Sequence, residues 1–135
     1  MTEKTNIKAG EFIVKETECA NIFTPEDFSE EHKMMRDSVI EFNEREVIAH
    51  KSKFEAKDFK LTEEVMKKAG EMGFLAVNVP EKYGGMGMGF VATMLVCEYM
   101  SSGSGSVSTA FGAHTGIGTM PILFYGTEEQ KKKYL

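Results

Sequence analysis

Apolar residues recur at helical spacing along much of the chain, and the longest such run lies between residues 30 and 57. Its apolar side chains fall near one face of a helix, while charged residues occupy the other faces. The residues of this apolar face are Met35, Val39, Phe42 and Ala49. The pattern predicts a long amphipathic helix that can break near Ile48.

Two capping signals stand in front of this run. Thr24 is followed by Pro25 and two acids, and Ser29 is followed by Glu30 and Glu31. A capping hydroxyl, a proline in the first turn and acids near the positive end of the helix dipole are typical of a helix N-terminus. We expect helical structure to begin here. The sequence before it shows no clear period, although residues 12–14 can form a short extended piece that packs on another element.

A second helix is predicted from a further capping signal. Leu61 precedes Thr62, and Met66 lies where a hydrophobic staple needs its partner. Gly73 can end this helix in a left-handed turn. The stripe predicted to be buried consists of Val65, Ala69 and Met72.

The next segment is predicted to turn. Residues 74–80 are mostly apolar and end at Pro80, and residues 83–89 contain four glycines. A glycine run can cradle a phosphate, but this one lacks the Gly-Lys-Ser/Thr ending and the dinucleotide-binding spacing. We therefore interpret it as a tight turn between helices.

Two more helical regions follow the glycines. Residues 90–100 are apolar almost all round, with Glu98 as the one charge, which predicts a helix buried on most sides. Residues 101–106 form a serine-glycine connector. Residues 107–125 mix small residues with large apolar ones. Because small residues lower helix stability, we expect the space that they leave to serve another purpose.

The last helix is predicted to begin at a full capping box formed by Thr127 and Gln130. The sequence stops at Leu135 without a C-cap glycine, and we expect it to be a piece of a longer protein. The pattern as a whole predicts an all-α bundle of about six helices. We divide the chain into an arm, residues 1–27, and a helical domain, residues 28–135.

Composition narrows the class of protein. The 135 residues are 41% hydrophobic and 27% charged, as is ordinary for one soluble domain. The formal net charge of −5 comes without a basic face, which argues against nucleic acid as a partner. The N-terminus resembles neither a signal peptide nor a transit peptide, and no run reaches membrane-spanning length, so we expect a cytoplasmic, bacterial protein.

Few residues suggest chemistry of their own. Cys19 and Cys97 form no CxxC pair and are interpreted as reduced thiols. The three histidines share no ligand spacing, so no metal site is expected. His114 either lies hydrogen-bonded in the core, the interpretation we favour, or lines a cavity. The ten methionines can mark a binding groove, but several share stripes with valine and alanine, which favours core filling.

Three segments, in this order and spacing, resemble the acyl-CoA dehydrogenase family. They are Met72-Gly73-Phe74-Leu75, Val79-Pro80-Glu81-Lys82-Tyr83-Gly84-Gly85-Met86-Gly87 and Gly126-Thr127-Glu128-Glu129-Gln130-Lys131-Lys132-Lys133-Tyr134-Leu135. The resemblance begins near Phe28. Between the last two segments, residues 111–118 resemble the very-long-chain branch more than the medium- or short-chain branch.

The resemblance implies the amino-terminal helical domain of an enzyme with a β-domain and a four-helix domain after it. Such enzymes hold FAD between the two later domains and oxidise acyl-CoA thioesters to trans-2-enoyl products. Electron-transfer flavoprotein is the implied acceptor, and the full-length enzyme is expected to be a homo-oligomer. We expect no catalytic residue and no flavin contact in this chain.

In the family the acyl tail lies between helices of this domain, which gives a reason for the small residues after residue 106. The candidate residues lining the acyl-tail pocket are Val107, Ser108, Phe111, Gly112, His114 and Thr115. Two alternatives stay open. The chain can be a stand-alone helical interaction module, or the same domain of a related flavoenzyme such as an acyl-CoA oxidase or a nitroalkane oxidase.

Overall fold

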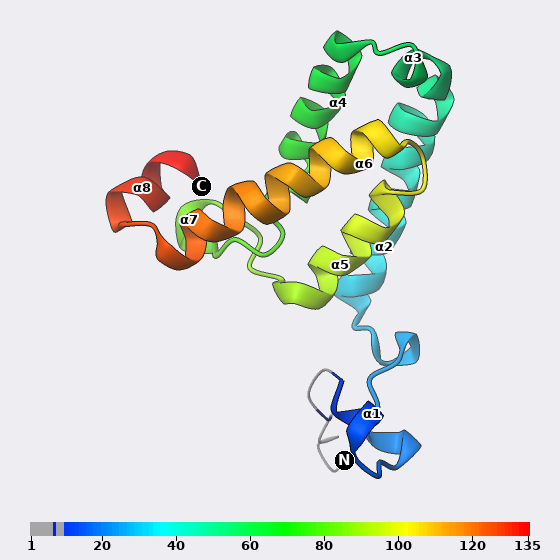
Figure 1. Cartoon of the computed structure of the whole chain (residues 1–135), viewed down its shortest axis with the longest axis vertical. Helices are drawn as coiled ribbons and strands as arrows, with labels where there is room; N and C mark the ends of the chain where they lie inside the picture. Colours follow the sequence, from blue (N-terminus) through cyan, green and yellow to red (C-terminus); the bar gives the residue numbers. More distant parts are fainter. Residues whose placement is uncertain (1–6, 8–9) are drawn as a thin grey trace.

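The computed structural model describes residue 7 and residues 10–135. Within these residues all of the regular secondary structure is helical (Figure 1). The helices after the arm are α2 (Glu30–Phe42), α3 (Lys51–Glu55), α4 (Phe59–Glu71), α5 (Gly89–Met100), α6 (Gly105–Gly112), α7 (Thr119–Tyr125) and α8 (Glu128–Tyr134). A π-helix, Ala113–Gly118, joins α6 to α7 in one rod. With this rod counted once, the all-α prediction of about six helices is confirmed.

The arm differs from its prediction. Residues 12–14 belong to a single helical turn, α1 (Glu11–Val14), and are not extended. They do not pack on another element, because Ile13 is 75% exposed and Val14 is 81% exposed. Figure 1 shows this segment beyond the N-terminal end of α2. What we expected of residues 1–6, 8 and 9 lies outside the described residues.

Both capping signals before α2 are used, with different results. Thr24 and Asp27 form a capping box around one 3-10 turn, Pro25–Asp27. Ser29 then caps α2 itself, because its Oγ accepts a hydrogen bond from the backbone N–H of His32 at 3.2 Å. The first signal therefore starts a turn, and the second starts the helix.

The long helix breaks near Ile48, as predicted. After α2 the chain forms a π-helix, Asn43–Val47, and a 3-10 turn, Ile48–His50. A π turn contains more residues than an α turn, so it moves the buried stripe toward the C-terminus. Val47 is consequently fully buried, and the prediction that Ala49 continues the stripe is wrong because Ala49 is exposed.

The core lies where α2 and α5 cross, with α4 and α6 closing it. Phe42 packs edge-on against Phe74, with ring centroids 5.4 Å apart and planes at 79°. Val39, Val96 and Val107 are 0–1% exposed. The spacing of Met35, Val39 and Phe42 thus predicted the buried face of α2 correctly.

Helix α4 begins earlier than predicted. Asp58 is its cap, and its carboxylate accepts from the backbone N–H of Leu61 at 3.0 Å, so Thr62 lies inside the first turn. An aspartate caps as well as a threonine, and the earlier cap adds slightly more than a turn of helix. The end of α4 agrees with the prediction, since Gly73 has φ +80°. Met72, however, is 42% exposed and does not extend the buried stripe.

Helix α5 leaves one side open. Its buried residues are Ala92, Leu95, Val96 and Met100. Phe90 is 66% exposed and Met94 is 43% exposed, and together with the exposed Glu98 they form a single stripe, so the expectation of burial on most sides is confirmed for this helix. The connector after it is shorter than predicted, because α6 already begins at Gly105.

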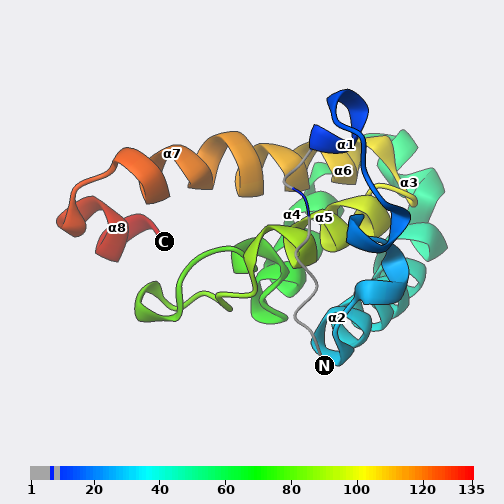
Figure 2. The same ribbon diagram turned by 90° about the horizontal axis from the view of Figure 1, so that it is seen from below.

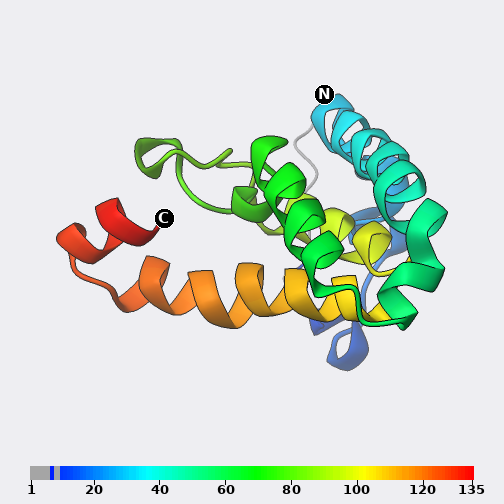
Figure 3. The ribbon, with the colours of Figure 1, turned by 90° about the horizontal axis from the view of Figure 1, so that it is seen from above.

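The rod of α6 and α7 runs past the core, and α8 folds back beside its far end (Figures 2 and 3). The segment between α4 and α5 lies on the same side as α8 (Figure 3). Two of the segments that resemble the family thus meet in space. Tyr83 of the first segment contacts Glu128 of the second, which comes 45 residues later in the chain.

We predict that Gly103→Ala lowers the free energy of unfolding by about 1–3 kcal/mol, the cost of overpacking a filled site. A Cβ at Gly103 would lie 2.6 Å from the Asn43 Oδ1 and 2.8 Å from a methyl group of Val47. Urea denaturation measures the effect. The control is Gly112→Ala, where a Cβ meets nothing within 4 Å. That change should stabilise the helix by about 0.5–1 kcal/mol, and a similar loss in both variants would contradict the packing argument.

Candidate functional site

The six residues predicted to line a pocket lie on different faces of the rod. Val107, Phe111 and Thr115 point into the core and are 0%, 2% and 7% exposed. They recur every four residues, and Thr119 continues the series. An α-helix alone would rotate this stripe away from the core, whereas the π turn at 113–118 brings it back.

The other three lie outside the core. Ser108 is half-buried, and its hydroxyl donates to the Oγ of Ser101 at 2.8 Å. Gly112 is exposed, with open space where a side chain would project. His114 is also exposed, so the interpretation of His114 as a core residue is wrong. The buried stripe passes through Phe111 and Thr115, and the ring of His114 falls beside it.

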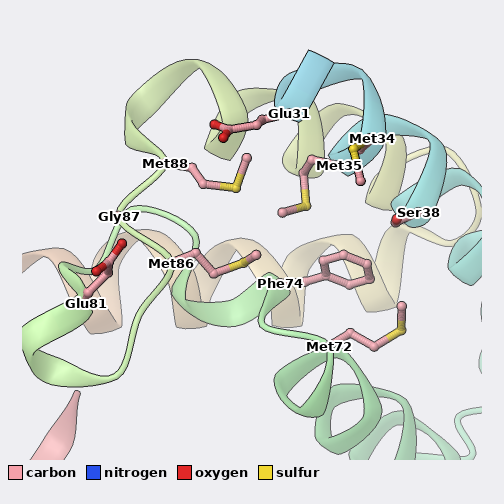
Figure 4. A pocket seen from close by; sticks show the side chains of 10 residues that line it. All are labelled: Glu31, Met34, Met35, Ser38, Met72, Phe74, Glu81, Met86, Gly87 and Met88. Carbon is pink, nitrogen blue, oxygen red and sulfur yellow. The ribbon is translucent and has the colours of Figure 1, made fainter. Parts of the chain in front are cut away.

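The structure contains a cavity at a different place from the predicted pocket. A cavity of about 530 Å³ opens between α2, the end of α4 and the glycine-rich segment (Figure 4). We call it the methionine groove. Its lining residues are Glu31, Met34, Met35, Ser38, Met72, Phe74, Glu81, Met86, Gly87 and Met88. None of the six predicted pocket residues belongs to it.

The methionine groove revises the interpretation of the methionines. Met35 is 7% exposed and does fill the core, but Met34 is 69% exposed and Met72 is 42% exposed. Met86 and Met88 come from the loop between helices and so share no helical stripe with valine or alanine. The position of these two methionines in a glycine-rich segment is the sequence feature from which the groove could have been predicted.

The glycine-rich segment, residues 83–89, is a tight turn, as predicted; we call it the glycine loop. Gly84, Gly87 and Gly89 have φ between +63° and +88°, which favours glycine. The loop lies flat on the preceding turn, because a Cβ at Gly85 would overlap the carbonyl oxygen of Val79.

The backbone amides of residues 84–88 in the glycine loop donate to carbonyls of the preceding residues, between Ala76 and Glu81. Met86 donates to the carbonyl of Ala76 at 3.1 Å, and Gly87 donates to that of Val79 at 2.9 Å. The N–H groups of Gly84, Gly85 and Met88 also donate to backbone carbonyls of the preceding residues. A phosphate cradle needs such donors free to point at the anion. Residues 84–88 therefore do not fit the pyrophosphate of a flavin dinucleotide.

A hydrogen bond joins the glycine loop to α8. The Tyr83 hydroxyl donates to the Glu128 carboxylate, with its oxygen 2.8 Å and 3.0 Å from the two carboxylate oxygens. This bond is the main reason that the pKa of Glu128 lies below its usual value. The Lys82 ammonium lies 4.6 Å from the centre of the Tyr83 ring and adds a cation–π contact.

The remaining reactive groups are isolated. Cys19 and Cys97 are free thiols, and burial raises the pKa of the Cys97 thiol while a hydrogen bond with Thr115 lowers it in part. Among residue 7 and residues 10–135, no three histidine, cysteine, aspartate or glutamate side chains group as a metal ion would require. Within the same residues no helix is both long and apolar enough to span a membrane.

Comparison with known proteins gives three informative similarities. A family model described as "Acyl-CoA dehydrogenase, N-terminal domain" matches residues 29–135. A relative named as a probable acyl-CoA dehydrogenase of Bacillus subtilis (strain 168) is 43% identical over 128 residues, which are 95% of this chain and 21% of the relative. The crystal structure of an acyl-CoA dehydrogenase complexed with FAD from Bacillus anthracis has a TM-score of 0.87 and 43% identity, and the match covers 96% of this chain and 22% of that one.

A further solved chain, described as the electron transferring flavoprotein of Acidaminococcus fermentans, has a TM-score of 0.72 and 31% identity. The match covers 83% of this chain and 29% of that one. The present chain thus spans about a fifth of the length of the two Bacillus relatives.

We predict that Tyr83→Phe destabilises the chain at neutral pH and that the loss shrinks in acid. The folded-state pKa of Glu128 is lowered, so this carboxylate contributes stability above its unfolded-state pKa. That contribution disappears as the pH falls through the folded-state pKa. Urea denaturation at a series of pH values measures it. Tyr125→Phe is the control, since Tyr125 is 89% exposed, and an equal pH profile in both variants would contradict the role of the hydrogen bond.

Proposed function

Because the chain belongs to the acyl-CoA dehydrogenase family, we propose that it is the N-terminal helical domain of a longer flavoenzyme that oxidises acyl-CoA thioesters to trans-2-enoyl-CoA in fatty acid β-oxidation. The family resemblance expected from the sequence is thereby confirmed. The relative from Bacillus anthracis is complexed with FAD, which supports FAD as the cofactor. The internally bonded amides of the glycine loop support an arrangement in which other parts of the longer protein hold that FAD.

In this proposal residues 1–27 are an arm and residues 28–135 form the domain. The rod of α6 and α7 supplies part of the wall of the acyl-tail pocket. The observation that carries this role is the bare face of the rod at Gly112, where nothing lies within 4 Å of a would-be Cβ. Ser108, four residues earlier, shares that face and also projects little side chain.

The other candidate residues take different parts in this wall. Val107, Phe111 and Thr115 are buried in the core, and so they would hold the rod in place from behind. His114 is exposed and would face whatever covers the rod. The open face at Ser108 and Gly112 is then the part that an acyl chain would touch.

The remaining expectations also belong to the longer protein. The similarity to a chain described as an electron transferring flavoprotein supports such a flavoprotein as the electron acceptor. Homo-oligomerisation, a cytoplasmic location and membership of the very-long-chain branch stay predictions from the sequence.

A second candidate is a helical interaction module, which the apolar surface of α7 and of the π-helix before it favours. Ile117 is 81% exposed, Phe124 is 65% exposed and Tyr125 is 89% exposed. Apolar surface of this kind marks contact with another protein or with another domain of the same protein. An acyl-CoA oxidase or a nitroalkane oxidase on the same scaffold is a closer alternative. Purified full-length protein separates the three through bound flavin, substrate class and electron acceptor.

We predict that Gly112→Leu in the full-length enzyme lowers kcat/KM selectively for long acyl chains. Leucine would occupy the space that substrate carbons need, and each excluded methylene forfeits about 0.8 kcal/mol, or about fourfold in kcat/KM. Short chains that never reach this position should be nearly unaffected. The measurement is a series of acyl-CoA chain lengths, with the melting temperature of each variant.

The control for this series is Ala113→Leu, which adds similar bulk at the next exposed position, turned about 100° around the helix axis. It should leave the chain-length profile unchanged. A uniform loss over all chain lengths that follows a lowered melting temperature would show that Gly112 permits close helix packing and does not line the pocket.

We also predict that the 135-residue chain by itself retains no FAD. Mixed with excess FAD and passed through gel filtration, it should elute without flavin absorbance, because residues 84–88 have no free amides for the pyrophosphate. The full-length protein, treated identically, should elute with bound flavin. A stoichiometric yellow complex of the chain alone would overturn the proposed division of roles.

A further inference from the structure

The methionine groove gathers thioether groups from three separate segments. Met34 and Met35 come from α2, Met72 follows the end of α4, and Met86 and Met88 come from the glycine loop (Figure 4). Their side chains differ in access to solvent. Met34, Met72 and Met86 are 69%, 42% and 36% exposed, whereas Met35 is 7% exposed. Three of these side chains are therefore open to a water-soluble oxidant.

Met86 differs from its neighbours in what its sulfur touches. The Sδ lies 2.9 Å from the position that a Cβ on Gly73 would take, so the sulfur packs directly on the left-handed turn that ends α4. The backbone N–H of Met86 also bonds to the carbonyl of Ala76. Met86 therefore holds the glycine loop against the end of α4 through its side chain, and against the 3-10 turn Phe74–Ala76 through its backbone.

The surroundings of Met86 suit a thioether and not a sulfoxide. A sulfoxide oxygen is a strong hydrogen-bond acceptor and needs a donor when it leaves water. The polar side chains of the groove are the carboxylates of Glu31 and Glu81, which accept, and the hydroxyl of Ser38. The Ser38 hydroxyl is the one side-chain donor among these lining residues, so an oxidised Met86 would find few donors in the groove and would gain by turning outward into water.

We propose that Met86 is an oxidation-sensitive contact whose conversion to the sulfoxide by a peroxide releases the glycine loop from the end of α4. In this step the Sδ lone pair attacks one peroxide oxygen, an S–O bond forms and the O–O bond breaks. With hydrogen peroxide, the leaving hydroxide takes the proton from the oxygen that is now bound to sulfur, which gives the sulfoxide and water. The sulfur loses two electrons and the peroxide gains them.

Oxidation of the other exposed methionines has less structural consequence. Met34 is the most exposed of them, and its sulfoxide can remain in water without moving the backbone. Met86, in contrast, carries its sulfur on a loop that is anchored by backbone hydrogen bonds at Met86, Gly87 and Met88. Of Met34 and Met86, it is therefore Met86 that couples oxidation to loop position.

The test treats the 135-residue chain with hydrogen peroxide and compares it with Met86→Leu and Met34→Leu. Leucine keeps the apolar volume but cannot be oxidised, so both variants should fold. Peptide mass spectrometry locates each added oxygen, thermal denaturation gives the Tm, and hydrogen exchange follows the amides of residues 86–88. Methionine sulfoxide reductases should reverse the change, which separates it from oxidation of the cysteine thiols.

We expect oxidation to lower the Tm of the wild-type chain and of Met34→Leu by about 5 °C. Exchange at residues 86–88 should accelerate in both, while Met86→Leu keeps its Tm and its protection. Equal sensitivity of Met86→Leu would overturn the proposal, as would an unmodified Met86 in a chain where Met34 is oxidised. Full oxidation of Met86 without faster exchange at residues 86–88 would overturn it too.

Discussion

The arrangement of the chain depends on a buried hydrogen bond between the end of α2 and the end of α5. Asn43 is 2% exposed, and its side-chain amide donates to the carbonyl of Tyr99 at 2.9 Å and to the Oγ of Ser102 at 2.8 Å. Because a buried donor without a partner costs about 1–3 kcal/mol, the two helix ends are held in one register. Gly103 then passes close to Asn43, and α6 starts from that corner.

Local signals in the sequence predicted the ends of helices well, because their physics is local. A cap such as Ser29 or Thr127 needs only the backbone of the next three residues, and both side chains accept from that backbone in the structure. Gly73 likewise needs only its own positive φ. The prediction of Thr62 as the cap of α4 was wrong because Asp58, four residues earlier, also has a capping side chain, and spacing alone does not rank the two.

The buried faces were harder to predict beyond the first turns, because two π-helices change the period. A π turn arises from tertiary contacts such as that of Asn43 with Tyr99, which a window of neighbouring residues does not contain. The shift exposes Ala49 and buries Val47. In the rod, the π-helix Ala113–Gly118 leaves His114 outside the buried stripe. The candidate pocket residues therefore divide between core and surface, although they are neighbours in sequence.

The methionine groove escaped prediction for a different reason, since it is assembled from segments that are distant in the sequence. Its position nevertheless connects two features that the sequence did identify. The glycine loop contacts the end of α4 through Met86 and contacts α8 through Tyr83. The loop amides are satisfied within the loop and the preceding turn, so the segment behaves as a rigid spacer between these two contacts. A displacement of the loop at the groove would for that reason also strain the hydrogen bond between Tyr83 and Glu128, which joins the loop to α8.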